Sequence, residues 1–319
     1  MKLRLRIQIY EKKFEQIWDN FIDNGVLGTI YHTRKFINYH PKERFQDKSI
    51  LIFNNNVLIC VLPCCKKGDK YFSYTGATYG GPVFLKKYYK TKYLIPIINK
   101  IFDYYDNQIE FRLANAIYFD ESSFILQYLL SRKLNLKLEL SWYINIENNF
   151  IDNIPEKSKK KAIKKIIKNN SLKCFIAKDE NDYKEYHKIL TELLNTRYKT
   201  NPTHNLKELL LLKEYLKEKQ ELYLVKENNI IIAGVYIIKV TNQCWYTVYM
   251  TRNINFKNST IALMYILYHI SNNAKSNNVK YLDYGICTEE QGKTINEGLS
   301  IFKEESLGGI SNYRYLFLK

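Results

Sequence analysis

The chain has 319 residues, 46% of them hydrophobic and 25% charged, which excludes a mainly disordered protein and favours two globular domains of roughly 150 residues each. Lys and Arg number 49 against 32 Asp and Glu, and the net charge of +17 favours a polyanionic partner: nucleic acid, a nucleotide-bearing substrate or a membrane surface. Only nine of these cations are Arg, the better reader of phosphates and base edges. An A/T-rich coding sequence would give the same excess of Lys, so the charge alone does not select a partner.

The first half of the chain predicts a helix, a hairpin and then alternating strands and helices. Residues 14–22 have helical periodicity, and Asn54-Asn55-Asn56 is a turn between two apolar runs. The expected elements are a helix at 14–22, strands at 49–53 and 57–63, a Tyr- and Gly-rich strand and loop at 71–83, a helix at 93–105, a strand at 109–113, a helix at 122–133 and a strand at 138–146.

The second half repeats this order. A turn at Glu227-Asn228-Asn229 again joins two apolar runs. The expected elements are helices at 183–194 and 209–218, strands at 221–226, 230–240 and 243–251, a helix at 260–276, a strand at 279–285, a helix at 292–305 and a final strand at 312–318.

The offset between the two halves is nearly constant. Asn54 and Asn228 lie 174 positions apart, and Leu113 and Gly285 lie 172 apart. Solenoid repeats have much shorter periods, so this pattern predicts a pair of domains. Each unit is expected to be a mixed α/β domain of the α+β class, a largely antiparallel sheet flanked by helices. We place the first unit at 1–150, a linking helix at 151–170 and the second unit at 171–319.

The linking segment is rich in lysine. Residues 155–168 predict a helix that begins near Pro155 and has Ile163, Ile166 and Ile167 on one face. The opposite face carries the expected polyanion-binding residues Lys157, Lys160, Lys161, Lys164, Lys165 and Lys168. This face is either a solvated surface or a ridge that follows phosphates, for example those of tRNA.

Several loops and strand ends carry candidate substrate- or donor-binding residues. A helix start can bind phosphate through its N–H groups, paired glycines allow close backbone approach to a ligand, and a histidine on a loop is a candidate base. Helix capping, a tight turn before Pro82 and ordinary strand burial explain the same residues equally simply. These candidates are Tyr79, Gly80, Gly81, His204, Tyr249, Arg252, Asn258 and Ser259.

The densest group of motifs lies near the end of the chain. It consists of Tyr281-Leu282-Asp283-Tyr284-Gly285, Asn296-Glu297-Gly298-Leu299, Phe302-Lys303-Glu304 and Leu307-Gly308-Gly309. Asp283 is expected near a strand end, where sites form in α/β sheets. Asn296 and Lys303 are seven positions apart and are expected to share a helix face. The alternatives to functional roles are that Asp283 caps a helix and that Lys303 faces solvent.

These motifs and the duplicated element order resemble the FemAB-like branch of the GNAT acyltransferase superfamily. The resemblance covers nearly the whole chain in element order, and it implies two tandem GNAT-like units whose final strand, 312–318, is able to pair with the first unit. It also implies that Asp283 orients or deprotonates an acceptor amine and that Lys303 stabilises the transferring acyl group or holds the donor. The glycine-rich loop typical of coenzyme A binding in GNAT proteins is absent here.

The resemblance implies an N-acyltransferase, with acyl-coenzyme A as the favoured co-substrate and no tightly bound cofactor. The expected acceptor is the amine of a nucleotide- or lipid-linked sugar or of a cell-envelope or polysaccharide precursor. An aminoacyl-tRNA-dependent transferase acting on a peptidoglycan precursor is the alternative, with tRNA as the partner. An RNA-binding protein on the same fold, without catalysis, is the third possibility.

The remaining features concern location and metals. Residues 1–9 alternate apolar and polar side chains and lack the apolar core of a signal peptide, and no apolar run approaches the roughly 20 residues of a spanning helix. We therefore expect a cytoplasmic protein without a transmembrane segment. The six cysteines form no C-x-x-C pair, so no metal site is expected. Cys287, which follows a strand end, is the one thiol that we regard as a candidate reactive group.

Overall fold

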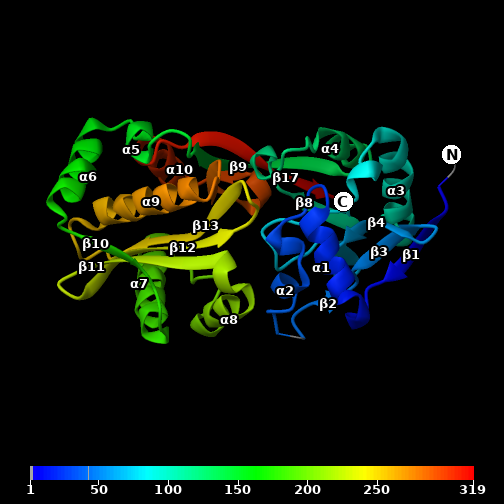
Figure 1. Cartoon of the computed structure of the whole chain (residues 1–319), viewed down its shortest axis with the longest axis horizontal. Coiled ribbons are helices and arrows are strands. Elements are labelled where there is room, and N and C mark those ends of the chain that lie inside the picture. Colours follow the sequence, from blue (N-terminus) through cyan, green and yellow to red (C-terminus); the bar gives the residue numbers. More distant parts are fainter. Residues whose placement is uncertain (1–2, 42) are drawn as a thin grey trace. The chain divides into compact units, whose positions relative to one another are not determined.

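The computed structural model describes residues 3–41 and 43–319 and divides the chain into two compact units (Figure 1). The first unit runs to Glu139 and also includes Glu289–Thr294 and Tyr313–Lys319. The second comprises Leu140–Thr288 and Ile295–Asn312. The chain therefore passes from one unit to the other within strands, whereas the sequence had suggested a link at the lysine-rich helix. That helix lies inside the second unit because Ile163 is buried in its core.

The first unit holds two groups of hydrogen-bonded strands, in the orders β1-β3-β4-β7 and β17-β8-β6-β5-β2. Its elements are β1 (Leu5–Ile9), α1 (Glu15–Asn24), α2 (Arg34–Ile37), β2 (Gln46–Asp47), β3 (Ile50–Asn54), β4 (Val57–Leu62), β5 (Cys65–Lys67), β6 (Lys70–Phe72), β7 (Val83–Phe84), α3 (Thr91–Tyr104), β8 (Ile109–Leu113), α4 (Phe124–Ser131), and parts of β9 (Asn135–Asn145) and β17 (Ile310–Leu318).

Strand β3 shows why the hairpin of this unit is apolar on both faces. Successive strand residues point to opposite faces of a sheet. Ile50 and Ile52 are buried with side chains of α3 and α4, whereas Leu51 is buried with Trp18 and Ile22 of α1. Helices therefore cover both faces, and the strand reads as a continuous hydrophobic run.

The second unit is built on one sheet, with the strand order β10-β11-β12-β13-β14-β9. Most neighbours are antiparallel, and β13 and β14 are the parallel pair. Its elements are α5 (Phe150–Asn153), α6 (Lys157–Asn169), β10 (Lys173–Ile176), α7 (Glu180–Tyr198), α8 (Leu206–Leu216), β11 (Gln220–Glu227), β12 (Ile230–Lys239), β13 (Cys244–Arg252), α9 (Ser259–Ser276), β14 (Tyr281–Ile286), β15 (Thr288–Glu289), β16 (Thr294–Ile295) and α10 (Glu297–Ile301), the two short strands lying partly in the first unit.

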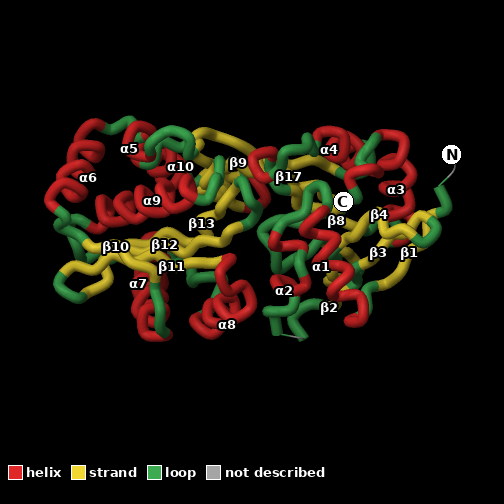
Figure 2. The backbone as a smooth tube through the Cα atoms, in the orientation of Figure 1, coloured by secondary structure: helices red, strands yellow, loops and turns green. Residues whose placement is uncertain are grey.

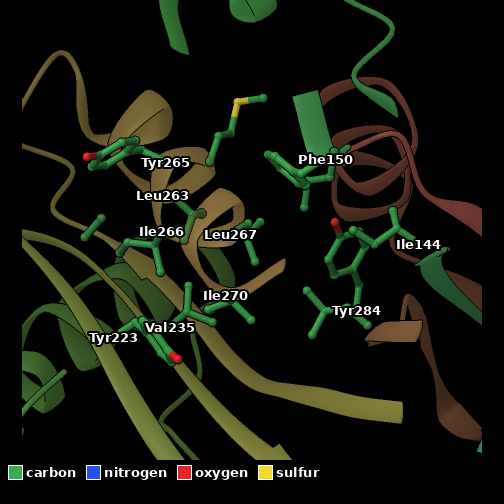
Figure 3. Close-up of a cluster of buried hydrophobic side chains, with 14 of the residues drawn as sticks. Ile144, Phe150, Tyr223, Val235, Leu263, Tyr265, Ile266, Leu267, Ile270 and Tyr284 are labelled. Atoms are coloured by element: carbon green, nitrogen blue, oxygen red, sulfur yellow. The ribbon is translucent and has the colours of Figure 1, made fainter. Parts of the chain in front are cut away.

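Helices cover both faces of this sheet (Figures 1 and 2). Helix α9 lies along one face, and α7 and α8 lie on the other. Figure 3 shows how α9 fills the core between the sheet and the short helix α5, with Val235, Ile144, Tyr284 and Phe150 around Leu263, Ile266, Leu267 and Ile270. Burial of this apolar helix face stabilises the unit.

Two parts of the sequence prediction differ from the structure. Residues 5–9, whose alternation served only to exclude a signal peptide, form β1 beside β3. The expected helix at 292–305 is wrong at its start, because Gly292 has a left-handed backbone, which a helix excludes, and Thr294 and Ile295 form the short strand β16. Gly292 has no room for a side chain, since a Cβ would lie 2.1 Å from the Leu138 carbonyl oxygen. Helix α10 begins at Glu297, and a π-helical turn follows at Phe302–Ser306.

The final strand contributes an ion pair to the first unit. Strand β17 pairs with β8 through Tyr315, Leu316 and Phe317. One position earlier, Arg314 donates from Nε to Glu139 Oε2 at 2.6 Å, and the two side chains are only 9% and 7% exposed. Within the described residues, no helix has both the length and the apolar character needed to cross a membrane.

This ion pair gives a stability prediction. Arg314→Met leaves the Glu139 carboxylate buried without its cation, so the free energy of unfolding should fall by about 3–5 kcal/mol. Adding Glu139→Gln should restore part of this loss, because the uncompensated charge is removed. Urea unfolding of the two variants measures both effects, and equal losses in the single and the double variant would contradict this account.

Candidate functional site

The sheet of the second unit opens between its two parallel strands. Strands β13 and β14 pair only over the three residues from Cys244 to Tyr246, and the last pair joins Tyr246 to Asp283. Beyond Tyr246, β13 continues to Arg252 and remains paired with β12 on its other edge. Within the described part of the chain, the edge of β13 that faces β14 therefore has no strand partner over residues 247–252, and we call this segment the open edge.

Both strands are irregular at the point where they separate. In β13, Tyr249 pairs with Tyr236 and Thr247 pairs with Ile237, which leaves Val248 as an extra residue. In β14, the pairing with β9 skips Tyr284 in the same way. Such bulges bend a strand and are frequent beside active sites. The two bulges occur within two positions of the last parallel pair and account for the separation of the strands.

A cationic helix start lies at the end of the open edge. Arg252 donates to Ser259 Oγ at 3.4 Å, and Ser259 is the buried first residue of α9. Asn258 stands at the N-cap position, but its side chain makes no capping hydrogen bond. The first N–H groups of a helix have no partner inside the helix and carry the positive end of its dipole. The structure thus brings together Arg252, Asn258 and Ser259, three of the residues singled out from the sequence.

A second arginine adds to this positive charge. Burial, followed by the nearby Arg197 guanidinium, lowers the pKa of Arg252. Arg197 lies in the last turn of α7, far from Arg252 in sequence, and periodicity gave no signal for it. Among the described residues neither arginine has a carboxylate partner within ion-pair distance, although Glu192 of α7 accepts from Asn255 Nδ2 at 3.2 Å nearby. Two like charges at a helix start favour an anion.

His204 and Tyr249 form a second group beside the open edge. His204 Nδ1 lies 2.7 Å from Tyr249 Oη, and the His204 backbone N–H donates to the same oxygen at 3.2 Å. Burial raises the pKa of Tyr249, so the phenol stays protonated near neutral pH. The sequence placed His204 on a loop and Tyr249 on a strand, and the fold joins them across 45 positions. Asn205, the next residue, caps α8 with Glu208.

Asp283 and Lys303 lie in the interior of the second unit. Asp283 is fully buried and accepts from the Gly285 N–H at 2.7 Å. Lys303 is 3% exposed, and its Nζ donates to the carbonyl oxygens of Gly285 and Ile286 at 3.0 and 2.9 Å. Burial lowers the pKa of Lys303, and the nearby Cys287 and Asp283 oppose that effect. Asn296 is the N-cap of α10 and accepts from the Leu299 N–H, so it does not share a helix face with Lys303.

The Gly-Gly segment of the first unit is filled by the protein itself. A Cβ on Gly80 would lie 1.4 Å from the Ser73 carbonyl oxygen, and one on Gly81 would lie 2.5 Å from Leu113 Cδ2. Gly81 also has a φ of +116°, a backbone that favours glycine. Tyr79 is buried between the rings of Tyr31 and Tyr118. The close backbone approach at Gly80 and Gly81 is therefore to other parts of the protein itself.

His32, which the sequence analysis did not single out, lies beside these glycines. Its Nδ1 accepts from the Thr29 N–H at 3.1 Å, and the backbone of Gly80 and Gly81 acts on the pKa of its ring. Burial lowers the pKa of His32 to about 4, so the buried ring is neutral near pH 7. Such partners lie nearly 50 positions away, and no local pattern indicates them.

The lysine-rich face of α6 is largely exposed. Its buried face holds Ile163, with Ile166 and Ile167 packed against the same core, as the periodicity predicted. Lys160 is partly buried and donates to the Asp152 carbonyl oxygen. The exposed ridge therefore consists of Lys157, Lys161, Lys164, Lys165 and Lys168. Within the described ranges, no cluster of three or more His, Cys, Asp or Glu side chains is placed to hold a metal ion.

The fold can be compared with solved structures. No protein-family model and no curated protein matches the sequence. A crystal structure of FemX matches with a TM-score of 0.70 and 11% identity, covering 98% of this chain and 97% of that one. L-PGS from Bacillus licheniformis matches with a TM-score of 0.57 and 11% identity over 98% and 93%. A tandem GNAT protein from the clavulanic acid biosynthesis pathway gives 0.56 and 5% over 98% and 97%.

The chain has the tandem GNAT fold of FemAB-like proteins. The fold class expected from the element order is confirmed. In this frame the open edge of β13 and the start of α9 form one continuous candidate site within the second GNAT-like unit. At identities of 5–11% the comparisons establish the fold, and the chemistry must be argued from the site.

The neutral His32 predicts a pH dependence of stability. Because its folded pKa lies below the unfolded value, its contribution is complete above about pH 6.5 and is lost as the pH falls towards 4. The loss amounts to about 3 kcal/mol at most. His32→Gln should remove this component from urea unfolding measured between pH 7 and 4, whereas His187→Gln should retain it. An unchanged pH profile in His32→Gln would be evidence against the buried neutral ring.

The His204–Tyr249 contact predicts a modest structural effect. Tyr249→Phe leaves the His204 N–H without its acceptor, so the free energy of unfolding should fall by about 1–2 kcal/mol. Amide exchange at residues 203–206 should become faster. The matched control is Tyr215→Phe on the exposed side of α8, which should change neither quantity. If the two variants behave alike, Tyr249 does not anchor this loop.

Proposed function

We propose that this chain is an N-acyltransferase that moves an acyl group from acyl-coenzyme A to an amine by direct attack. The observation that carries the proposal is the open edge of β13, which ends at Arg252 and the start of α9. A strand edge without a strand partner, beside a cationic helix terminus, suits a donor with a polar acyl end and a phosphate-bearing end. The tandem GNAT fold supports the same reaction class.

The proposed roles follow from the positions of the residues. The donor phosphates lie on the first N–H groups of α9, near Arg252 and Arg197, and the acyl chain runs along the open edge. The amine nitrogen attacks the thioester carbonyl, the new C–N bond forms as the C–S bond breaks, and the thiolate leaves and is protonated. His204, held by Tyr249, accepts the proton from the attacking amine.

The proposed acceptor is the amine of a sugar or of a cell-envelope or polysaccharide precursor, met in the cytoplasm where acyl-coenzyme A is available. Two of the structures with the same fold are named FemX and L-PGS, and they motivate an envelope-related acceptor.

An aminoacyl-tRNA donor is the second candidate, and one observation favours it. Helix α6 presents five exposed lysines along a single ridge, a suitable surface for a phosphate backbone. On this proposal the ridge binds the tRNA while the same open edge receives the aminoacyl end.

Thermal shift measurements distinguish the two donors. On the proposed function acetyl-coenzyme A stabilises the protein, and saturation at 100 times the dissociation constant adds about 2.7 kcal/mol. Arg252→Gln should weaken this binding by about 1.5–3 kcal/mol, because a charge-assisted contact is lost. Arg132→Gln, an exposed arginine of the first unit, is the matched control and should bind normally.

The possible outcomes distinguish the two donors. Stabilisation by acetyl-coenzyme A that Arg252→Gln weakens supports the acyl-coenzyme A donor. Stabilisation only by charged tRNA, lost when the five ridge lysines are replaced, supports the aminoacyl donor. Binding of acetyl-coenzyme A that Arg252→Gln leaves unaffected would show that the donor site has been misplaced.

A further inference from the structure

Both hydrogen-bonding groups of Gly285 are held by side chains. The Gly285 N–H donates to Asp283 Oδ1 at 2.7 Å, and its carbonyl oxygen accepts from Lys303 Nζ at 3.0 Å. The residue has a φ of +75°, a conformation that side chains other than hydrogen seldom adopt. A Cβ here would also lie 2.9 Å from Tyr246 Oη. Asp283 and Lys303 thus clamp one backbone bend from two sides.

The Lys303 ammonium donates to two backbone carbonyl oxygens inside the protein, those of Gly285 and Ile286. The nearby Cys287 and Asp283 side chains raise the pKa of Lys303 and so oppose the effect of burial. Since the side chain is 3% exposed and its ammonium is held by two carbonyl groups, Lys303 is not positioned to contact a substrate.

The backbone around Lys303 is adapted to keep it there. The residue lies in a π-helical turn, a rare conformation that is frequent at functional sites. Its carbonyl oxygen accepts from the Gly309 N–H at 2.9 Å, and a Cβ on Gly309 would lie 2.8 Å from that oxygen. The motif from Phe302 to Gly309 therefore delivers one lysine side chain inward to β14.

The bend at Gly285 lies where the open edge begins. Tyr246, which lies against Gly285, is the last residue of β13 that pairs with β14. After the bend, Ile286 pairs with Ser141 of β9, on the side of β14 away from β13. The direction in which β14 leaves its parallel partner thus depends on the geometry at Gly285.

We propose that Lys303 is a positioning residue: it locks the bend at Gly285 and so holds β13 and β14 apart where the acyl donor binds. This inference deepens the proposed function, since the donor at the open edge is part of it. The resemblance to FemAB-like proteins had suggested that Lys303 holds the donor itself. Here the lysine acts through Gly285, and the open edge is what meets the donor.

The test uses the full chain without ligand first. Lys303→Met keeps the length of the side chain but removes the ammonium, so hydrogen–deuterium exchange should become at least about tenfold faster at residues 284–288 and at 246–249. Cys287→Ala removes a neighbouring thiol that favours the charged ammonium and should give a smaller increase in the same peptides, and Cys287→Ser, which retains a polar group there, a smaller one still. These readouts do not depend on the reaction that the protein catalyses.

Acetyl-coenzyme A then serves as the probe of function. The dissociation constant should rise by about tenfold or more in Lys303→Met and by a lesser factor in Cys287→Ala. In turnover assays the KM of the donor should rise while the KM of the amine acceptor stays unchanged, a split that general destabilisation does not produce. Should Lys303→Met fail to fold, the Cys287 pair still tests the proposal.

Matched controls remove a comparable group elsewhere. Lys239→Met deletes a partly buried lysine of the same unit that pairs with Glu221, and Cys60→Ala deletes a buried thiol of the first unit. Neither should alter exchange at 284–288. Unchanged exchange in both Lys303→Met and Cys287→Ala would overturn the positioning role. Altered exchange with no binding of acetyl-coenzyme A in the wild type would retain the lock and reject the proposed donor.

Discussion

The separation of β13 and β14 is the constraint on which the candidate site depends. Two parallel strands that part after three paired positions leave backbone groups exposed to one side, an arrangement that a continuous sheet does not offer. The separation is built from an extra residue in each strand and from a left-handed bend at Gly285. Buried charge holds that bend, because Asp283 and Lys303 occupy its N–H and its carbonyl oxygen.

The two units share an element order but use the corresponding place differently. Leu113, which aligns with Gly285 at the offset of 172, packs its side chain against Gly81. His32 lies beside the same backbone. In the first unit, side chains and backbone therefore fill the position that corresponds to the open edge beside β13 in the second unit. On the proposed function, this difference favours the second unit as the place where the donor binds.

Local periodicity predicted the elements that bury one face. The helix at 14–22, the strand at 109–113 and the inward Ile163 of α6 all follow from patterns within a few residues, and the structure confirms them. The start of the helix expected at 292–305 was wrong because Gly292 has a left-handed backbone and lies against the Leu138 carbonyl oxygen, far away in the sequence. Composition and spacing do not encode such contacts.

For the same reason, only part of the candidate site was predicted from the sequence. Arg252 and Ser259 lie close in sequence, and both were singled out because strand ends and helix starts commonly bind ligands. Arg197 and His32 were missed because their partners lie 55 and about 50 positions away. Lys303 was identified by its motif, but its role was not, since an inward and an outward lysine look alike in a sequence. Burial distinguished the two.

The most direct test of the central claim is hydrogen–deuterium exchange of the wild-type chain with and without acetyl-coenzyme A. If the open edge and the start of α9 hold the donor, exchange should slow at residues 247–252 and 259–262, while the Gly80–Gly81 turn of the first unit stays unchanged. Protection confined to the first unit or to α6, with residues 247–262 unaffected, would contradict the account.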